Sequence, residues 1–186
     1  MTRIIAGTAG GRRLRTPPGD RTRPTSDRVR EALFSAVGSW AGPGGLTGLH
    51  VLDLYAGSGA VGLEAWSRGA ASVTFVESHG PTAALIAANA RSLGFTDAVV
   101  AAAPVRQVLA RPSHTTYDLV VADPPYDLPD DDLADVLGLV AGVVAPQALV
   151  VVERSARGAA PRWPAPLEPG RSRRYGETAL WYGHAP

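Results

Sequence analysis

The sequence predicts an α/β fold in which a parallel sheet is covered by helices on both faces. From Val51 onward, short apolar runs typical of buried strands alternate with segments of helical periodicity. The first of these runs passes directly into a glycine-rich turn, since residues 51–62 read V-L-D-L-Y-A-G-S-G-A-V-G. A strand, a glycine-rich turn and a helix in this order are typical of Rossmann-like folds that bind a nucleotide-type cofactor.

The segment before this repeating unit predicts a small β-hairpin and one helix. Residues 3–15 contain two short β-like pieces around glycines, and we expect a hairpin whose tips carry arginines. Residues 16–24 form a Pro- and Gly-rich connector, after which Thr25 or Ser26 can cap a helix. That helix, expected over residues 27–38, places four apolar residues on one face: Val29, Leu33, Phe34 and Val37.

The rest of the chain predicts alternating strands and helices that end in an antiparallel hairpin. Strands are expected at 51–55, 72–76, 98–102, 117–122 and 148–152, and helices at 60–68, 81–93, 105–110 and 130–141. The run at 117–122 is almost continuously apolar, as a buried parallel strand should be. A Pro-rich connection over 157–170 contains Trp163, and residues 173–182 form a terminal hairpin that turns at Gly176.

The glycine-rich turn and the acid that follows it predict where a cofactor binds. Gly57, Gly59 and Gly62 fit the G-x-G-x-x-G pattern, in which glycines let the backbone approach the ligand closely. Glu77 lies 20 positions after Gly57, at the end of the next predicted strand, where a carboxylate can hold ribose hydroxyls. These four residues fit both NAD and S-adenosylmethionine.

Asp53 favours S-adenosylmethionine. It lies within the first strand, four positions before Gly57, where it can receive the cationic amino group of a methionine moiety. A dinucleotide needs no such acid, because a carboxylate at this position would repel its pyrophosphate.

The tetrapeptide Asp123-Pro124-Pro125-Tyr126 ends the predicted strand 117–122 and is expected beside the glycine-rich turn. Its prolines fix the backbone and leave carbonyl oxygens as acceptors. If Asp123 and the Pro124 carbonyl hold the two N–H bonds of an exocyclic base amine, the lone pair of its nitrogen is aimed at a sulfonium methyl group. Tyr126 can stack on the base, which has to be flipped out or already unpaired.

Composition restricts the possible chemistry. The 186 residues are 45% hydrophobic, enough for one well-buried domain with a small appendage. The absence of cysteine excludes disulfides and thiolate catalysis, and the four histidines show no metal-ligand spacing, so we expect no metal. No apolar run approaches the roughly 20 residues that span a bilayer. With no secretory signal either, we expect a cytoplasmic protein.

Positive charge is concentrated at the N-terminus. The net charge is only +1, but all 18 basic residues are arginine, and eight of them lie in the first 30 positions. This asymmetry predicts an RNA-binding appendage and linker over residues 1–24 and a catalytic domain over 25–186. We expect removal of the appendage to cost the domain little stability. The candidate RNA-binding residues are Arg3, Arg12, Arg13, Arg15, Arg23 and Arg28.

Several motifs together resemble the RsmD family, bacterial methyltransferases of small-subunit ribosomal RNA. The resemblance is carried by R-I-I-A-G-T-A-G-G-R-R-L, T-R-P-T-S-D-R-V-R-E-A-L-F, V-L-D-L-Y-A-G-S-G-A-V-G-L-E-A, F-V-E, D-P-P-Y and R-R-Y-G-E-T-A-L-W-Y. The D-P-P-Y alone is shared by many amino-methyltransferases, whereas the two N-terminal motifs are more particular to this family. The resemblance implies methyl transfer from S-adenosylmethionine to the exocyclic N2 of one guanine in 16S ribosomal RNA, within the small ribosomal subunit, by a monomer.

The resemblance also implies roles for individual residues. The catalytic candidates are Asp123, Pro124 and Tyr126, and the cofactor-binding candidates are Asp53, Tyr55, Gly57, Ser58, Gly59, Glu77 and Ser78. One departure from the family is the stretch 101–104, A-A-A-P, where such enzymes usually offer a polar residue to the adenine. We therefore expect backbone or apolar groups to hold the adenine.

Three other functions account for part of the pattern. An adenine-N6 methyltransferase acting on DNA would use the same D-P-P-Y chemistry, but the N-terminal hairpin motif argues against it. An NAD-dependent oxidoreductase would explain the glycines and Glu77 and leave Asp53 and D-P-P-Y without roles. A non-catalytic RNA-binding module would explain only the arginines.

Overall fold

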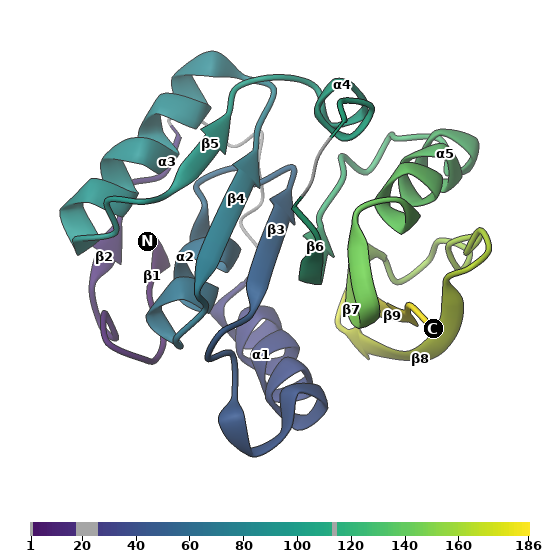
Figure 1. Ribbon diagram of the computed structural model, residues 1–186, viewed down its shortest axis with the longest axis horizontal. Coiled ribbons are helices and arrows are strands. Elements are labelled where there is room, and N and C mark those ends of the chain that lie inside the picture. Colours follow the sequence, from purple (N-terminus) through teal and green to yellow (C-terminus); the bar gives the residue numbers. More distant parts are fainter. Residues whose placement is uncertain (1, 18–25, 113–114) are drawn as a thin grey trace.

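The computed structural model describes residues 2–17, 26–112 and 115–186 of the chain (Figure 1). The main strands are β3 (His50–Leu54), β4 (Ser72–Val76), β5 (Val99–Ala101), β6 (Tyr117–Ala122), β7 (Val144–Ser155), β8 (Glu168–Tyr175) and β9 (Thr178–His184). They form one sheet in the order β5-β4-β3-β6-β7-β9-β8. The strands from β3 to β7 pair in parallel, and β9 pairs antiparallel with both β7 and β8. The predicted parallel sheet with a C-terminal antiparallel hairpin is confirmed.

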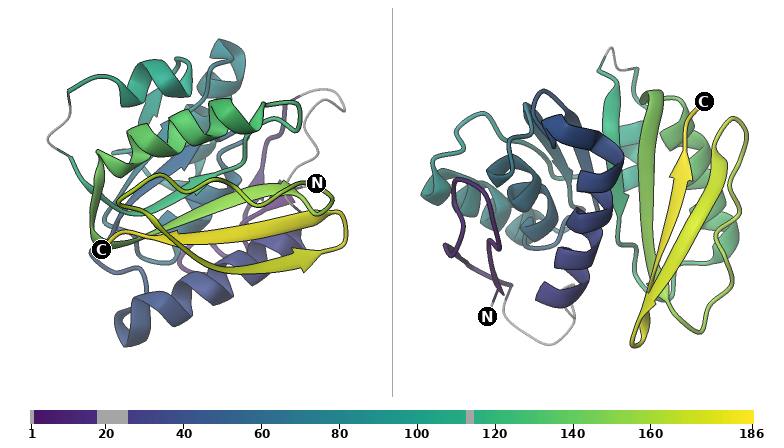
Figure 2. Two further views of the ribbon diagram at one scale, coloured as in Figure 1. Left: turned by 90° about the vertical axis from the view of Figure 1, so that its right-hand side faces the viewer. Right: turned by 90° about the horizontal axis from the view of Figure 1, so that it is seen from below.

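Helices cover both faces of this sheet (Figure 2). They are α1 (Asp27–Ala41), α2 (Ala60–Ser67), α3 (Gly80–Leu93), α4 (Val105–Leu109) and α5 (Asp130–Ala141), with a 3₁₀ turn η1 (Gly42–Gly44) after α1. Buried side chains of α1, α2 and α3 share one apolar core with the sheet, and those of α4 and α5 share the core on the other face. The central strands of the sheet are therefore buried on both faces, which explains their almost continuously apolar sequences.

Most element boundaries fall within a few residues of the sequence prediction. The ranges of β4, β6 and α5 coincide with the predicted ones, and the terminal hairpin turns at Gly176, which has a φ of 62°. In contrast, β7 is much longer than the predicted 148–152, and β8 begins inside the predicted Pro-rich connection. Val144 at the start of β7 pairs with Tyr117 of β6, whereas the end of β7 and the start of β8 are extended by pairing with β9 beyond the apolar residues.

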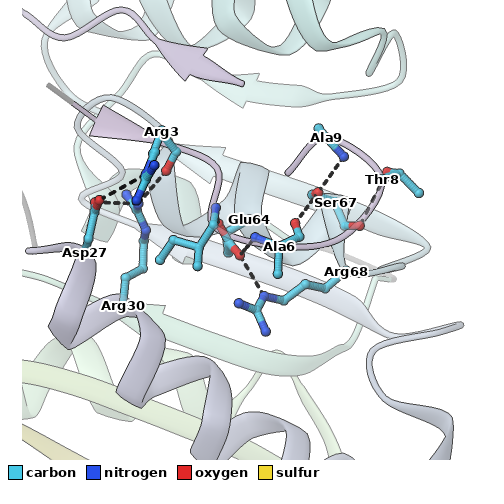
Figure 3. A network of polar contacts seen from close by, with 10 residues as sticks. Arg3, Ala6, Thr8, Ala9, Asp27, Arg30, Glu64, Ser67 and Arg68 are labelled. Carbon is cyan, nitrogen blue, oxygen red and sulfur yellow. Dashed lines mark hydrogen bonds and ion pairs between the residues drawn. The ribbon is translucent and has the colours of Figure 1, made fainter. Parts of the chain in front are cut away.

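The first helix buries the expected face. Ser26 is its N-cap, and the Ser26 hydroxyl accepts a hydrogen bond from the Val29 N–H. The four predicted apolar residues of α1 are buried, and so is Arg30, which no sequence pattern places in the core. The Arg30 guanidinium donates to the backbone carbonyl of Arg3 and to the carboxylate of Asp27, at 2.9 Å for the latter (Figure 3). The start of α1 is thereby tied to the N-terminal segment.

The N-terminal hairpin consists of β1 (Thr2–Arg3) and β2 (Arg13–Leu14), which pair antiparallel as predicted. Its turn, residues 6–11, contains no arginine. The expectation that the tip carries arginines is therefore wrong. The turn is held to Ser67 of α2 through Ala6, Thr8 and Ala9, although Gly7, Thr8, Gly10 and Gly11 are exposed. The arginines lie on or beside the two strands: Arg3, Arg12, Arg13 and Arg15.

The turn of the hairpin docks on the last turn of α2 (Figure 3). The fully buried carboxylate of Glu64 accepts hydrogen bonds from the backbone N–H groups of Ile5, at 2.6 Å, and Ala6, at 3.0 Å. The Ser67 hydroxyl donates to the Ala6 carbonyl at 2.6 Å, and the Ser67 carbonyl accepts from the Thr8 N–H at 2.7 Å. Because the last carbonyls of a helix have no partner within it, the hairpin completes the C-terminal end of α2.

Candidate active site

The glycine-rich turn between β3 and α2 uses each glycine for a different reason. Gly57 has a φ of 54°, and a Cβ there would meet no atom within 4 Å, so this part of the turn is open to a ligand. Gly59 is the N-cap of α2 with a φ of 78°, and a Cβ there would lie 3.0 Å from Ile86. At Gly62 a Cβ would lie 2.3 Å from the Phe75 ring. Gly62 is therefore required by packing of α2 on the sheet, whereas the space beside Gly57 could admit a ligand.

Glu77 follows β4 and lies against this turn. One oxygen of its carboxylate accepts from the Gly57 N–H at 3.0 Å, and the other accepts from the His79 N–H at 2.8 Å. The spacing of 20 residues between Gly57 and Glu77 thus corresponds to direct contact. An ionised carboxylate has about four acceptor positions, so Glu77 can hold ribose hydroxyls as well. Next to it, Ser78 is exposed, and Ser58 on the turn is half-buried.

Asp53 lies beneath the turn, inside the core. Only 3% of the residue is exposed, and its carboxylate accepts from the Gly62 N–H at 2.9 Å. Burial raises the pKa of Asp53 to about 8, although the bond from Gly62 acts in the opposite direction and the negative charges of Asp123 and Glu77 raise it further. Through its hydrogen bond with the Gly62 N–H, Asp53 fixes the first turn of α2.

Tyr55 connects β3 to the turn with a φ of 59°, in the left-handed region that few non-glycine residues adopt. Its half-buried ring packs against the core on the α5 side of the sheet. Burial raises the pKa of the Tyr55 hydroxyl. The strained backbone lies between β3 and Gly57, where it redirects the chain into the turn.

The D-P-P-Y corner lies beside the glycine-rich turn, as predicted. Leu54 and Ala122 are neighbours in the β3–β6 pair, so Asp123 and the turn leave the same edge of the sheet. The Asp123 N–H continues this ladder with a 3.4 Å bond to the Leu54 carbonyl. Pro124 is buried, whereas Tyr126 is 59% exposed.

Arg154, near the end of β7, holds this corner from the other side. Its guanidinium donates to the carbonyls of Pro125, at 3.1 Å, and Leu128, at 2.9 Å, and pairs with the Asp130 carboxylate at 3.2 Å. No sequence motif selects it. The sequence feature that could have identified Arg154 is its position just beyond the predicted strand 148–152, at the edge of the sheet where ligands bind in such folds.

The predicted RNA-binding arginines are on the surface where the structure describes them. Arg3, Arg12, Arg13, Arg15 and Arg28 are exposed, and Arg23 lies outside the described residues. A hollow of about 410 Å³ is lined by Arg3, Gly11, Arg13 and Asp27.

Asn89 of α3 links this N-terminal segment to the cofactor turn. It is 1% exposed, and its side-chain amide both donates to and accepts from the backbone of Arg15, at 2.9 Å each. The same amide group donates to the Ser58 carbonyl at 3.1 Å. The chain that leaves the hairpin is therefore bound to the glycine-rich turn through one side chain.

Neither a metal cluster nor a membrane-spanning helix is found in the described part of the chain. Among residues 2–17, 26–112 and 115–186, no three His, Cys, Asp or Glu side chains gather where they could hold a metal ion. Within the same ranges, no helix has the length and apolar character needed to cross a membrane.

Comparison with solved structures shows the same architecture in other proteins. The Escherichia coli protein yhhF matches with a TM-score of 0.86 and 31% identity, over 99% of this chain and 97% of its own. Protein TTHA0928 of Thermus thermophilus matches with a TM-score of 0.81 and 33% identity, over 98% of both chains. SMU.776, solved in complex with SAH, has a TM-score of 0.68 at 16% identity, over 85% of this chain and 48% of its own, which is a similarity of fold alone.

Sequence comparison agrees. The chain is 35% identical to Ribosomal RNA small subunit methyltransferase D of Escherichia coli K12, over 95% of this chain and 86% of the relative. It is 35% identical to the protein of the same name from Haemophilus influenzae, over 81% of this chain and 77% of the relative. The family model described as Conserved hypothetical protein 95 matches residues 2–184. Since this match includes the hairpin, both sides of the candidate site and the C-terminal strands, the chain belongs to the RsmD family.

Proposed function

We propose that this protein transfers a methyl group from S-adenosylmethionine to the exocyclic N2 of one guanine in 16S ribosomal RNA, within an assembled or assembling small subunit. We further propose that it acts in the cytoplasm as a monomer. The observation that carries the proposal is the pairing of β3 with β6, which puts the turn at Gly57 beside Asp123. The relative named Ribosomal RNA small subunit methyltransferase D supports ribosomal RNA as the substrate.

The residues of the turn fit the cofactor. Gly57 leaves open space for a ligand, and the Glu77 carboxylate accepts a hydrogen bond from the Gly57 N–H. In this proposal, the same carboxylate binds the ribose hydroxyls. Asp53 would receive the amino end of the methionine moiety, close to the N-terminus of α2. When bound, the cofactor supplies an electrophilic methyl group on its sulfonium sulfur. An NAD-dependent oxidoreductase would use the same turn but has no need of a D-P-P-Y corner next to it.

The D-P-P-Y corner would hold the acceptor nitrogen. In this proposal, the Asp123 carboxylate and the Pro124 carbonyl each accept one N–H bond of the guanine amine, which directs the lone pair of the nitrogen towards the methyl group. As the new N–C bond forms, the carbon–sulfur bond to that methyl group would break and leave a neutral thioether. The nitrogen would gain positive charge until it releases one proton, and the Asp123 carboxylate would stabilise that charge. Tyr126 stacks on the base. Arg154 would keep the corner rigid, because it binds the carbonyls of Pro125 and Leu128.

The direct test is mass spectrometry of 16S ribosomal RNA nucleosides from cells with and without the gene. We expect loss of one N2-methylguanosine in the deletion strain. Small subunits from that strain then serve as substrate for the purified protein. A methyl group found on adenine N6, or no change in the RNA, would overturn the assignment.

For Asp123→Ala, we expect methyl transfer to fall by about 10²–10³-fold, the usual loss for one positioned group in a reaction centre. Cofactor binding and folding should stay close to wild type. Asp127→Ala is the matched control, since Asp127 is an exposed acid of the same loop. Single-turnover rates of both variants decide the role, and a rate within threefold of wild type for Asp123→Ala would exclude it.

A further inference from the structure

The outer edge of the sheet carries a second group of arginines. The edge strand β8 is exposed over residues 168–174, and Arg171, Arg173 and Arg174 lie within four consecutive positions of it. In Figure 1, β8 lies on the opposite side of the molecule from β1 and β2 of the N-terminal hairpin. These arginines are therefore separate from the basic N-terminal segment.

The arginines of β8 differ from their neighbours in how they are paired. Arginines near α5 are neutralised by its acids: Arg106 pairs with Asp132 and Asp135, Arg154 with Asp130, and Arg162 with Asp131. Among the described residues, Arg171, Arg173 and Arg174 have no ion pair. The guanidinium of Arg171 lies 5.4 Å from the centre of the Tyr182 ring, a contact that leaves its charge unneutralised. The positive charge of β8 is therefore available to an anionic partner.

The sheet register places these charges at the level of the catalytic corner. Ala122 pairs with Val152, Val152 with Trp181, and Trp181 with Ser172. One step further along the strands, Asp123 of the corner and Arg173 of β8 lie at the same level. Neighbouring strands are about 4.8 Å apart, so three spacings separate the two backbones by roughly 14 Å.

The three side chains point to both faces of β8. Directly opposite residues of an antiparallel pair share a face, so Arg173 shares the face of its partner Leu180, which belongs to the core on the α1 side. Arg171, over the Tyr182 ring, lies on that face too. Arg174 and Arg154 both pair with Ala179, and Arg154 contacts α5, so Arg174 points to the α5 side. The charges thus surround the edge of the sheet.

We propose that β8 is a second RNA-contact surface, in which Arg171, Arg173 and Arg174 bind phosphates of the ribosomal RNA that flanks the target guanine. This inference rests on the proposed function. The catalytic corner would then lie between two basic surfaces, the N-terminal hairpin with the start of α1 on one side and β8 on the other. RNA that touches both has its phosphates spread across the molecule, which suits a folded segment of the subunit better than a short hairpin.

The test combines Arg171→Ala, Arg173→Ala and Arg174→Ala in one variant and measures binding of small subunits at several salt concentrations. If two or more phosphate contacts are lost, the magnitude of the slope of log K against log salt falls by roughly 1.4–1.8 or more. Affinity for S-adenosylmethionine and the melting temperature should match wild type. A variant with lysine at all three positions keeps the charge and should keep most of the slope. Arg111→Ala, an exposed arginine after α4, is the single-charge control.

A second variant, Arg3→Ala with Arg13→Ala, separates the failure of this proposal from failure of the proposed function. If wild type does not bind subunits at all, the proposed function is wrong. If the Arg3/Arg13 variant binds more weakly and the β8 variant binds like wild type, the β8 proposal is overturned. In that case, the arginines of β8 serve only to prevent edge-to-edge pairing of sheets, and the β8 variant should aggregate with its RNA affinity unchanged.

Discussion

The carboxylate of Asp53 connects the core of the protein to the glycine-rich turn. It is buried under the turn and binds the Gly62 N–H, so it determines how α2 begins. Its pKa of about 8 means that the folded protein holds a proton on Asp53 at neutral pH. A cationic group placed beside it would favour the ionised form. The same residue is therefore a structural acceptor without cofactor and, in our proposal, a charged partner for the methionine moiety.

The raised pKa of Asp53 predicts how stability depends on pH. Between pH 3.8 and about 8, the unfolded chain has lost the proton of Asp53 while the folded protein keeps it. Raising the pH through this range therefore favours unfolding, and the full cost is present above pH 8. Asp53→Asn keeps an acceptor for Gly62 but does not titrate. From pH 5 to pH 8.5, we expect wild type to lose more than ~1.4 kcal/mol relative to this variant, the equivalent of one pKa unit.

Urea unfolding of both proteins at the two pH values checks this expectation. Asp97→Asn, a substitution of an exposed aspartate after α3, is the control and should follow wild type. A stability difference between wild type and Asp53→Asn that stays constant with pH would show that Asp53 is ionised in the folded protein.

At the scale of elements, the N-terminal hairpin behaves as the C-terminal cap of α2. Its backbone N–H groups donate to the carboxylate of Glu64 and to the carbonyl of Ser67, and one of its carbonyls accepts from the Ser67 hydroxyl. This close approach requires a glycine at position 7, which has a φ of 83° and where a Cβ would lie only 1.8 Å from the Ser67 carbonyl oxygen. Docking on α2 thus explains the glycine of the motif A-G-T-A in the hairpin.

Gly7→Ala is therefore expected to displace the hairpin. Gly11→Ala is a matched control, because Gly11 has nearly the same φ, 81°, but open space around its Cβ position. Both variants carry the cost of a left-handed alanine, roughly 1–2 kcal/mol. Only Gly7→Ala adds a collision with the backbone of α2, so we expect it to lower the free energy of unfolding well below that of Gly11→Ala. Equal values in chemical denaturation would contradict the docking.

If the N-terminal segment contacts RNA and the glycine-rich turn binds the cofactor, as we propose, the contact of Asn89 with both Arg15 and Ser58 predicts coupling between the two sites. Asn89→Asp keeps an acceptor for the Arg15 N–H but loses the donor to both carbonyls. We expect S-adenosylmethionine to bind wild type more tightly when RNA is present, by the roughly 5–150-fold typical of coupled sites. In Asn89→Asp, this factor should shrink towards one.

Calorimetric titration of cofactor with and without RNA measures the coupling factor. Ser92→Ala is the control, since the Ser92 hydroxyl binds the Asn89 backbone carbonyl and its removal leaves the bridge intact. An unchanged factor in Asn89→Asp would mean that the two sites communicate by another route, or only through the substrate.

For the whole molecule, local sequence patterns predicted the order of strands and helices, but they did not predict contacts between residues far apart in the sequence. The apolar run at 117–122 and the helical period at 130–141 depend on neighbours in sequence, so both were predicted with the correct ends. The Glu64 contact with Ala6 joins residues 58 positions apart, and that of Arg154 with Pro125 joins residues 29 apart. Neither contact produces a periodic pattern of residues that the sequence alone would reveal. The burial of Arg30 was missed for the same reason, because one of its acceptors comes from the hairpin.

This difference changes what we expect from removing residues 1–24. From sequence, the segment has few large apolar residues, and its loss is expected to cost little. In the structure, Ile4, Ala9 and Leu14 are buried in the core that contains α1. Without the hairpin, the buried carboxylate of Glu64 loses the N–H groups of Ile5 and Ala6 and, among the described residues, keeps its ion pair with Arg68. Hydrogen bonds to a charged group are worth roughly 1.5–3 kcal/mol each, so we expect the truncated protein to lose several kcal/mol of stability or to fail to fold.

The Arg3→Ala, Arg13→Ala double variant removes charge from the same segment without removing its anchor. Both arginines are exposed, so we expect its stability to stay within ~1 kcal/mol of wild type. RNA binding should weaken and lose salt dependence, while S-adenosylmethionine affinity is retained, because Gly57 and Glu77 are untouched. Urea unfolding, cofactor titration and RNA titration of the double variant and the truncation separate the two roles. A truncated protein as stable as wild type would show that the hairpin is a detachable arm, and a double variant with unchanged RNA affinity would show that its arginines do not bind phosphate.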